Sequence, residues 1–556
     1  MSSQTLSRYG STAAALFASA QTMLMKRDYV KLKPRQRSCR KMPYSRQSRR
    51  DVASILLAVT SCLALPACAA EPRFLDRAAA LPVAHEYQGG WAHFVGGGVA
   101  ILDCNDDGRP DLFAAGGAAD ATLLVNASDP GGAIRFEAGP IDPLPGATGA
   151  YPLDFDGDAV VDLMVLRNGP NVALRGRGDC TFADATETWG LPAGAEWSTA
   201  FAATWEGDAA FPTLAIGNYV DADDPAGPFG TCDVNWLIRP EGRRYRAPVA
   251  LEPGFCPLSM LISDWRRDGR PMLRISNDRQ YYIRDGYEQM WSLDPLRELG
   301  PEDEWDPLML WGMGIASRDL TGDGLPEVFL TSMGDQMLMR NDGARFETVP
   351  YETGTFAQRP FTGGDGRPST GWHAEFADMD NDARPDLFIA KGNVDQMPGL
   401  AMTDPNNLLM QQPDGTFAER ADVAGIATTE RSRGAGIADL NGDGRLDLVV
   451  VNRRAPLEIW ENATEGAGNW LAIDLRQDAP NVHAVGAFVE LRIDGVVQTR
   501  EVTVGGGHVS GSLVPLHFGL GSAARAELRV IWPDGSVDDW RPVTAGAVHR
   551  VDRAAP

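Results

Sequence analysis

The chain has 556 residues, of which 44% are hydrophobic and 23% charged, so it holds enough apolar material for two domains and is not a disordered acidic tail. Its formal charge of −24 is unevenly spread, because residues 1–70 hold twelve Lys or Arg against two acids. The remaining 39 basic and 73 acidic residues give the rest of the chain a charge of −34, which repels phosphates and argues against DNA or RNA as partners.

Residues 1–70 predict a basic extension followed by a signal peptide, and Met42 is a possible true start. After a twin arginine, the apolar run 52–65 leads into small residues at 66–70, which is the order of segments in an export signal. We therefore expect a periplasmic or extracellular protein. The export route stays open between Sec and twin-arginine, and lipid anchoring at Cys68, the one route to a membrane, is the alternative to soluble release.

An acidic nine-residue turn followed by a short hydrophobic strand recurs along the rest of the chain. Two weaker copies, at Trp205 and Asp264, have lost most of their acids. The turns recur every 51–61 residues. The five clear copies are DCNDDGRPDLF, DFDGDAVVDLM, DLTGDGLPEVF, DMDNDARPDLF and DLNGDGRLDLV, which begin at Asp103, Asp154, Asp319, Asp378 and Asp439.

A repeat of this length made of short strands is typical of a propeller with about four strands per blade. The pattern therefore predicts an all-β fold in which residues 71–462 form a seven-bladed β-propeller. The segment 73–99 is placed to supply the missing outer strand of the last blade and so to close the ring.

The turns also predict bound cations. Oxygen-bearing side chains at positions one, three, five and nine present several hard oxygens to one centre, and carboxylates held that close repel one another. Flexible oxygen-only sites favour Ca²⁺ over Mg²⁺, so we expect about five Ca²⁺ sites. The predicted ligands are Asp103, Asn105, Asp107, Asp111, Asp154, Asp156, Asp158, Asp162, Asp319, Thr321, Asp323, Glu327, Asp378, Asp380, Asp382, Asp386, Asp439, Asn441, Asp443 and Asp447.

Four cysteines follow the predicted signal peptide, and an oxidising compartment permits disulfides. Cys232 and Cys256 bracket one Pro-rich loop and are the expected pair. Cys104 with Cys180 is a weaker pairing, because two separate buried thiols would look the same in the sequence.

The repeat stops before residues 463–556, which alternate apolar and polar side chains and carry the turn pairs Asp494-Gly495 and Asp534-Gly535. This pattern predicts a small β-sandwich-like domain. Its histidines, His508 and His517, are expected on strand faces rather than as metal ligands.

Several motifs resemble a known family. The acidic turns resemble the FG-GAP, or VCBS, calcium loops of integrin α-chain propellers. The turns and their flanking segments together resemble bacterial members of the cartilage acidic protein family over roughly residues 85–460. The segments that carry this resemblance are GGWAHFVGGGVAILDCNDDG, WGMGIASRDLTGDG, SMGDQMLMRNDG and GWHAEFADMDNDARPDLFIAKGNVDQMPG. NVHAVGAFVEL, LHFGLG and VIWPDGSVDDW resemble the ASPIC/UnbV domain, which follows the propeller in that family. The resemblance implies a calcium-binding propeller and extends to proteins encoded beside natural-product pathways.

Large side chains stand just before several turns, where the first strand of each blade begins around the channel mouth. They favour binding of a small molecule, a glycan or a protein on that face, and ordinary core packing is the competing interpretation. The predicted ligand-binding residues are Trp197, Trp311, Trp372, His373 and Arg433.

Catalysis is the alternative to binding. The sequence has no nucleophile motif, phosphate loop or dinucleotide fingerprint, so no catalytic residue is assigned. His373 and Glu375, alternate residues of one predicted strand, could join Asp306 in acid/base chemistry such as cyclisation or isomerisation. A structural or adhesive surface role is the second alternative, favoured if the protein is lipid-anchored.

Overall fold

The computed structural model describes residues 70–554 except 193, 222–223, 225–230, 279–285 and 357–364. The predicted extension, signal peptide, Met42 and Cys68 lie outside the described residues. Residues 69–556 form one compact unit. Its secondary structure is almost entirely β, which confirms the predicted fold class. The described helices are single turns, at α2 (Thr186–Trp189), α3 (Ala421–Ala424) and the 3₁₀ turns η1 (Ala78–Ala80), η2 (Trp91–His93), η4 (Pro301–Asp303) and η5 (Tyr351–Thr353).

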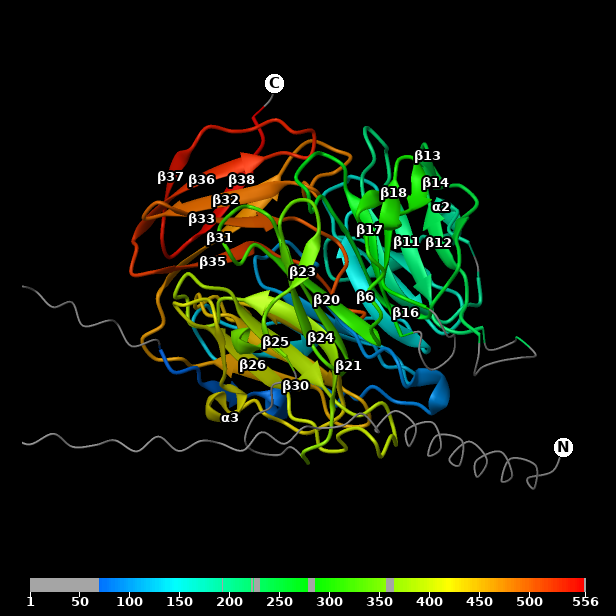
Figure 1. Ribbon diagram of the computed structural model, residues 1–556, viewed down its shortest axis with the longest axis horizontal. Helices are drawn as coiled ribbons and strands as arrows, with labels where there is room; N and C mark the ends of the chain where they lie inside the picture. The colour runs from blue at the N-terminus through cyan, green and yellow to red at the C-terminus, as the bar shows by residue number, and fades with distance from the viewer. Residues whose placement is uncertain are drawn as a thin grey trace, which may run out of the picture. The chain divides into compact units, whose positions relative to one another are not determined.

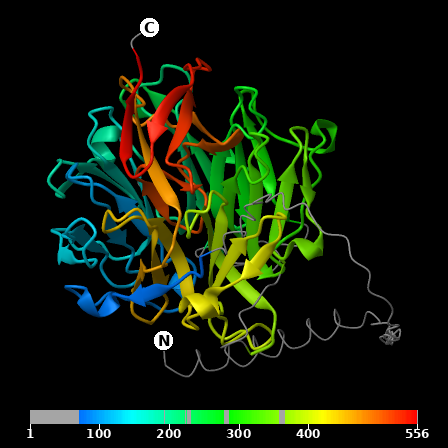
Figure 2. The same ribbon diagram turned by 90° about the vertical axis from the view of Figure 1, so that its left-hand side faces the viewer.

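Seven antiparallel groups of four strands, which we call sheets, follow one another along the described residues, and their colours run from blue to yellow in Figures 1 and 2. A strand of the C-terminal part adds a fifth, parallel strand to the first group, and direct pairing joins the fifth and sixth groups into one eight-stranded sheet. The first four are β2 (Val99–Leu102), β3 (Asp111–Ala114), β4 (Thr122–Asn126) and β5 (Phe136–Ala138); β6 (Ala147–Leu153), β7 (Asp162–Arg167), β8 (Val172–Gly176) and β9 (Phe182–Asp184); β10 (Ser198–Thr204), β11 (Thr213–Asn218), β12 (Asn235–Ile238) and β15 (Val249–Leu251); and β16 (Pro257–Ser263), β17 (Met272–Asn277), β18 (Gln289–Leu293) and β19 (Leu296–Glu298).

The remaining three sheets complete the series. Strands β21 and β24 also pair directly, at Met333–Thr370 and Gly334–Ser369. A short hairpin, β13 (Pro240–Glu241) with β14 (Arg244–Tyr245), is inserted in the third sheet. The three sheets are β20 (Gly312–Arg318), β21 (Glu327–Gly334), β22 (Met337–Asn341) and β23 (Phe346–Thr348); β24 (Ser369–Ala377), β25 (Asp386–Lys391), β26 (Asn407–Gln411) and β27 (Phe417–Glu419); and β28 (Ser432–Ala438), β29 (Asp447–Asn452), β30 (Glu458–Asn462) and β1 (Phe74–Asp76).

The ends of the series meet. Strand β1 pairs antiparallel with β30, with Phe74 opposite Asn462, so the beginning of the described chain supplies the outer strand of the last sheet as expected. The first strands of successive sheets also contact one another in a cycle, from β2 through β6, β10, β16, β20, β24 and β28 back to β2. This is a propeller-like arrangement of seven sheets.

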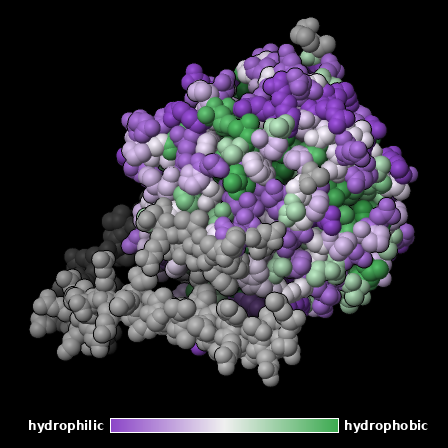
Figure 3. All heavy atoms as spheres, turned by 90° about the vertical axis from the view of Figure 1, so that its right-hand side faces the viewer, coloured by the Kyte–Doolittle hydropathy of each residue, from purple (hydrophilic) through white to green (hydrophobic). Residues whose placement is uncertain are grey.

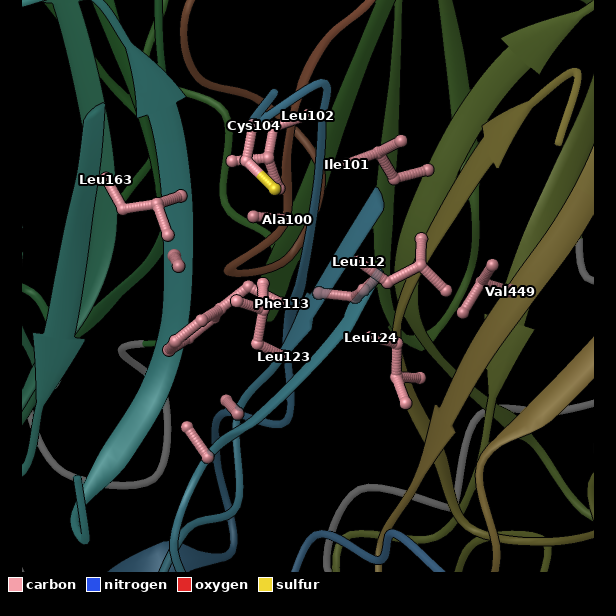
Figure 4. Packing of buried hydrophobic residues seen from close by; sticks show 14 of the residues in the cluster. Ala100, Ile101, Leu102, Cys104, Leu112, Phe113, Leu123, Leu124, Leu163 and Val449 are labelled. Carbon is pink, nitrogen blue, oxygen red and sulfur yellow. The ribbon is translucent and has the colours of Figure 1, made fainter. Parts of the chain in front are cut away.

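The sheets pack face to face through strands that are buried on both sides. In Figure 4, Phe113 of β3 points toward Leu163 of β7, whereas Leu112 and Leu124 point toward Val449 of β29. A strand between two neighbouring sheets needs apolar side chains on both faces, which explains continuous runs such as LVVV at residues 448–451 in place of strict alternation. On the face shown in Figure 3, hydrophilic side chains surround small hydrophobic patches.

The C-terminal part forms two further sheets, drawn in orange and red in Figure 1. One sheet has the order β35-β31-β38 and the other β33-β32-β36-β37, and their apolar faces share one core. This agrees with the small β domain expected from the alternating pattern. The strands are β31 (Asn469–Arg476), β32 (Phe488–Ile493), β33 (Val496–Glu501), β35 (Leu516–Gly521), β36 (Arg525–Ile531), β37 (Arg541–Thr544) and β38 (Val548–Asp552).

One segment of the C-terminal part, residues 503–513, runs through the middle of the propeller, and we call it the channel segment. Its strand β34 (Gly511–Leu513) pairs in parallel with β2, and single bridges join it to β6, β10, β16 and β20. It reaches β24 by a hydrogen bond, in which His508 N donates to His373 Nδ1 at 3.1 Å. It packs closely against β28, where a Cβ added at Gly434 would lie 2.5 Å from Ser510 Oγ. The chain therefore fills its own channel.

Glycine makes this close approach possible. A Cβ added at Gly98 would lie 1.8 Å from Val509 O, and one at Gly149 would lie 2.0 Å from the same oxygen. No side chain fits at those distances, so the Gly-rich beginnings of the first strands are explained by the segment that passes them.

Candidate functional site

The acidic turns share one hydrogen-bond pattern that begins at position one. Asp439 accepts from Asp443 N at 3.1 Å and from Gly444 N at 2.8 Å. Asp264, in a turn that has lost most acids, accepts from Asp268 N at 3.1 Å and Gly269 N at 2.9 Å. The first carboxylate therefore builds the turn whether or not the other acids are present.

In all five acid-rich turns the carboxylate at position nine accepts hydrogen bonds from two backbone N–H groups, an arrangement that we call the clamp. Asp447 accepts from Leu440 N and from Asn462 N, each at 2.8 Å, and so ties the turn to the third strand of its sheet. Sequence spacing alone assigned these residues to the metal, and the clamp is a role that the sequence interpretation missed. The same pair of bonds is made by Asp111, Asp162, Glu327 and Asp386.

Position three decides which turns gather three carboxylates. In the turns with Asp at this position, one oxygen from each of three carboxylates lies within 4.8 Å of the others, and all six side chains are buried. Asp156 binds Arg175 through one oxygen at 2.8 Å, and its other oxygen has no partner. Asp380 is 1% exposed, and neither of its oxygens has a hydrogen-bond partner among the described residues. The two clusters are Asp154, Asp156 and Asp162, and Asp378, Asp380 and Asp386.

The electrostatics of these clusters fit a cation. Burial raises the pKa of Asp162 to about 8 and that of Asp380 to about 6, since a carboxylate without water is costly to ionise. Burial and the neighbouring carboxylates raise the pKa of Asp386 well above its usual value. A divalent ion would supply the missing charge to the unpartnered oxygens, which is the chemistry that these donor sets offer.

The other three turns have Asn105, Thr321 and Asn441 at position three. Among the described residues, no cluster of three carboxylates is found there. Asp107 is paired with Arg109 at 2.5 Å, and Asp443 is paired with Arg445. Two of the three turns, those at Asp103 and Asp439, therefore satisfy part of their charge with arginine. The expected count of about five ions stays a prediction.

Removal of Asp380 tests the stronger cluster. In calcium, Asp380→Ala should lose that site's binding energy, which is about 2.7 kcal/mol per site at a hundredfold excess of calcium over Kd. In chelator the same change removes a buried, unpartnered charge, so the variant should equal or exceed the wild type in stability. Thermal melting in both conditions measures the two effects.

Asp264→Ala is the matched variant, because its turn has the same backbone bonds without the cluster. It should lower the melting midpoint equally with and without calcium. Equal calcium dependence in the two variants would contradict the assignment of the ion to the Asp380 turn.

The residues predicted to bind a ligand at the channel mouth are packed together. Trp372 is 0% exposed, donates from Nε1 to Gly392 O at 2.7 Å and stacks under the buried guanidinium of Arg433 at 4.0 Å. Trp197 is buried against Phe94 and Trp91, and Trp311 is half-buried. Trp197 and Trp372 are therefore packed in this structure, because the loops of this end form one apolar cluster with them.

The ligand-binding role of these residues stays a prediction. In this structure Trp197, Trp372 and Arg433 support packing, while His373 lies beside Glu375. His373 Nε2 lies 3.5 Å from Glu375 Oε2. The third acid/base candidate, Asp306, is exposed on the loop before β20 and makes no hydrogen bond or ion pair with either residue among those described.

Both cysteine pairs form disulfides, Cys104–Cys180 and Cys232–Cys256. The second is the expected pair. The first joins two neighbouring sheets across 76 residues of sequence.

A cavity of about 340 Å³ lies where the first strands, the channel segment and the C-terminal sheets meet. His373 and Glu375 of β24, Arg318 of β20 and Arg500 of β33 line it. The C-terminal part is held beside it by backbone bonds to the Asp378–Asp386 turn, since Gly468 N donates to Asp380 O at 2.8 Å. The cavity and the carboxylate cluster are therefore positioned by the same contact.

Comparison with known proteins agrees with this architecture. The FG-GAP-like repeat family matches residues 319–389 and 398–476, and the ASPIC and UnbV family matches residues 477–555. The chain combines FG-GAP-like repeats with an ASPIC/UnbV domain. This confirms the resemblance expected from the turns and from the C-terminal motifs. The FG-GAP-like repeats are of a kind that often binds Ca²⁺, and they indicate a ligand-binding or adhesive domain.

The chain is also similar to curated proteins. Cartilage acidic protein 1 of Xenopus tropicalis is 30% identical over 254 residues, which are 44% of this chain and 37% of the relative. The human protein of that name is 26% identical over 179 residues, 32% of this chain and 26% of the relative. The matched region thus spans about a third or less of these relatives.

A solved structure, BBS1N in complex with ARL6DN soaked with mercury, aligns with a TM-score of 0.42 at 10% identity, covering 71% of this chain and 99% of that chain. Among the residues that the structure describes, no helix is long and apolar enough to cross a membrane.

Proposed function

We propose that this protein is an exported, calcium-stabilised binding module, with calcium in the acidic turns and a small molecule, glycan or protein as its ligand or partner. The observation that carries the calcium part is the buried Asp380 side chain, whose two oxygens have no partner inside a cluster of carboxylates. The two disulfides are consistent with an exported protein. The body's negative charge disfavours nucleic acid as the partner.

The role of calcium is to hold the ligand-binding geometry. Gly468 and Gly521 donate to the backbone of the Asp378–Asp386 turn, so an ion that fixes this turn also fixes the C-terminal part and the cavity beside it. In the Asp378–Asp386 cluster the three carboxylates would hold the ion, and Asp154, Asp156 and Asp162 would do so in the second sheet.

A second candidate function is favoured by one observation. His373 and Glu375 lie 3.5 Å apart in the cavity, which is an arrangement that can move a proton on a bound molecule. Acid/base chemistry such as cyclisation or isomerisation would use this pair.

Calcium dependence of stability tests the proposed function. Thermal melting of the mature chain in millimolar calcium should give a clearly higher midpoint than melting in chelator, because each occupied site adds RT ln(1 + [Ca²⁺]/Kd) to the stability of the folded state. Magnesium at the same concentration is the control and should give a smaller rise. A midpoint that does not depend on calcium would refute the calcium assignment.

A further inference from the structure

The cavity between the propeller and the C-terminal part has the make-up of a ligand site. Its wall has an apolar part, which includes Ile315, Ala374, Ile437, Val504 and Leu516, and several polar and charged groups also line it. Ligand pockets in proteins combine these two features at this size. The side chain of Glu375 is 29% exposed, so solvent reaches the cavity.

The imidazole of His373 presents a donor to the cavity. His508 N donates to its Nδ1 at 3.1 Å, so the neutral ring carries its proton on Nε2. His373 is 3% exposed, and its Nε2 has no hydrogen-bond partner. Glycine at position 507 leaves room for the ring in this position, because a Cβ there would lie 2.5 Å from His373 Cε1.

Two guanidinium groups add positive charge. Arg318 is 6% exposed and its Nε has no hydrogen-bond partner. Arg500 donates from Nη1 to His517 O at 2.9 Å. Their guanidinium carbons lie 5.5 and 5.8 Å from the centre of one ring, that of Phe518, so both charges belong to the same region.

The acids of the cavity leave this charge incompletely balanced. Asp378 and Asp439 belong to the acidic turns, where the proposed calcium would offset their charge. Glu501 accepts hydrogen bonds from Ser263 Oγ and Asp264 N and has the charge of Arg267 nearby. Glu375 is the remaining carboxylate of the lining, against two arginines. Buried charges need partners, so the site has room for one further negative charge.

We propose that this cavity binds a small amphipathic monocarboxylate, whose carboxylate pairs with Arg318 and Arg500 and whose apolar body lies against Ile315 and Ile437. The inference rests on the proposed binding function and names its ligand class. Arginine suits this role because its planar donors match a carboxylate. One negative charge balances the site, which favours a monocarboxylate over a doubly charged phosphate ester.

Hydrocinnamate, a phenyl ring on a short chain ending in a carboxylate, is the probe, and hydrocinnamide is its neutral match. With calcium saturating, calorimetric titration of the mature chain should show saturable one-to-one binding of the acid, at least about tenfold tighter than the amide. Arg318→Gln and Arg500→Gln should each weaken the acid by about tenfold or more. Arg492→Gln, at an arginine outside the cavity lining, is the matched control and should change nothing.

Glu375→Gln should tighten hydrocinnamate binding, because it removes a carboxylate that competes for the arginines. A gain in affinity cannot be explained by misfolding of the variant, whereas a loss in the arginine variants could be. Equal affinity for acid and amide, no saturable binding of the acid, or weaker binding by Glu375→Gln would each overturn the inference. Calcium-dependent melting in the same samples separates the two proposals. A calcium-dependent midpoint without acid binding refutes only the ligand class, whereas acid binding without calcium dependence refutes only the calcium assignment.

Discussion

Trp372→Ala should lower the free energy of unfolding by about 3–5 kcal/mol, which is the usual cost of truncating a fully buried aromatic side chain. The indole is 0% exposed and carries two specific contacts, its hydrogen bond to Gly392 O and the stacked guanidinium of Arg433. Arg433 is itself 0% exposed, so the variant leaves a buried charge beside an empty space. Denaturant titration with calcium saturating measures the loss.

Trp311→Ala is the matched comparison, because this second indole of the same cluster is only half-buried. Trp311→Ala should lower the free energy of unfolding by clearly less than Trp372→Ala does. A loss below about 1 kcal/mol for Trp372→Ala would mean that the ring is not packed in solution, and the channel-mouth site predicted from the sequence would then regain support.

Asp447→Ala should cost about 2–6 kcal/mol, since it leaves two buried N–H groups without an acceptor at about 1–3 kcal/mol each. The two donors are Leu440 N and Asn462 N, both at 2.8 Å, and the carboxylate is 0% exposed. Because the clamp is made of backbone bonds, we expect the loss in chelator as well as in calcium. Denaturant titration under both conditions gives the two values.

The control for Asp447→Ala is Asp129→Ala, which removes an exposed carboxylate and should stay within about 0.5 kcal/mol of the wild type. A loss that appears only in calcium would assign Asp447 to the ion rather than to the clamp. Asp447→Asn should fall between the two, because an amide keeps one acceptor oxygen.

The sequence by itself determined the repeats, the turns and the strand that follows each of them. The bonds that shape a turn are short in range, as between Asp439 and Gly444, so the residues of one repeat are enough to specify it. This is why even the acid-poor turn at Asp264 was recognised and adopts the same conformation. The closing strand near Phe74 was also predictable, since the last repeat lacks an outer strand.

Tertiary structure alone decided what fills the channel and where a ligand could enter. His508 and His373 are 135 residues apart, and Ser510 and Val99 are 411 apart, so no local period encodes their contact. Glycine was the one available signal, because Gly98 and Gly149 are needed where Val509 passes. The loops around Trp372 close the channel mouth at which the sequence predicted a ligand, and the channel segment fills the channel. Beside the C-terminal sheets a cavity remains, in which Arg318 and Arg500, distant in sequence, lie near one ring.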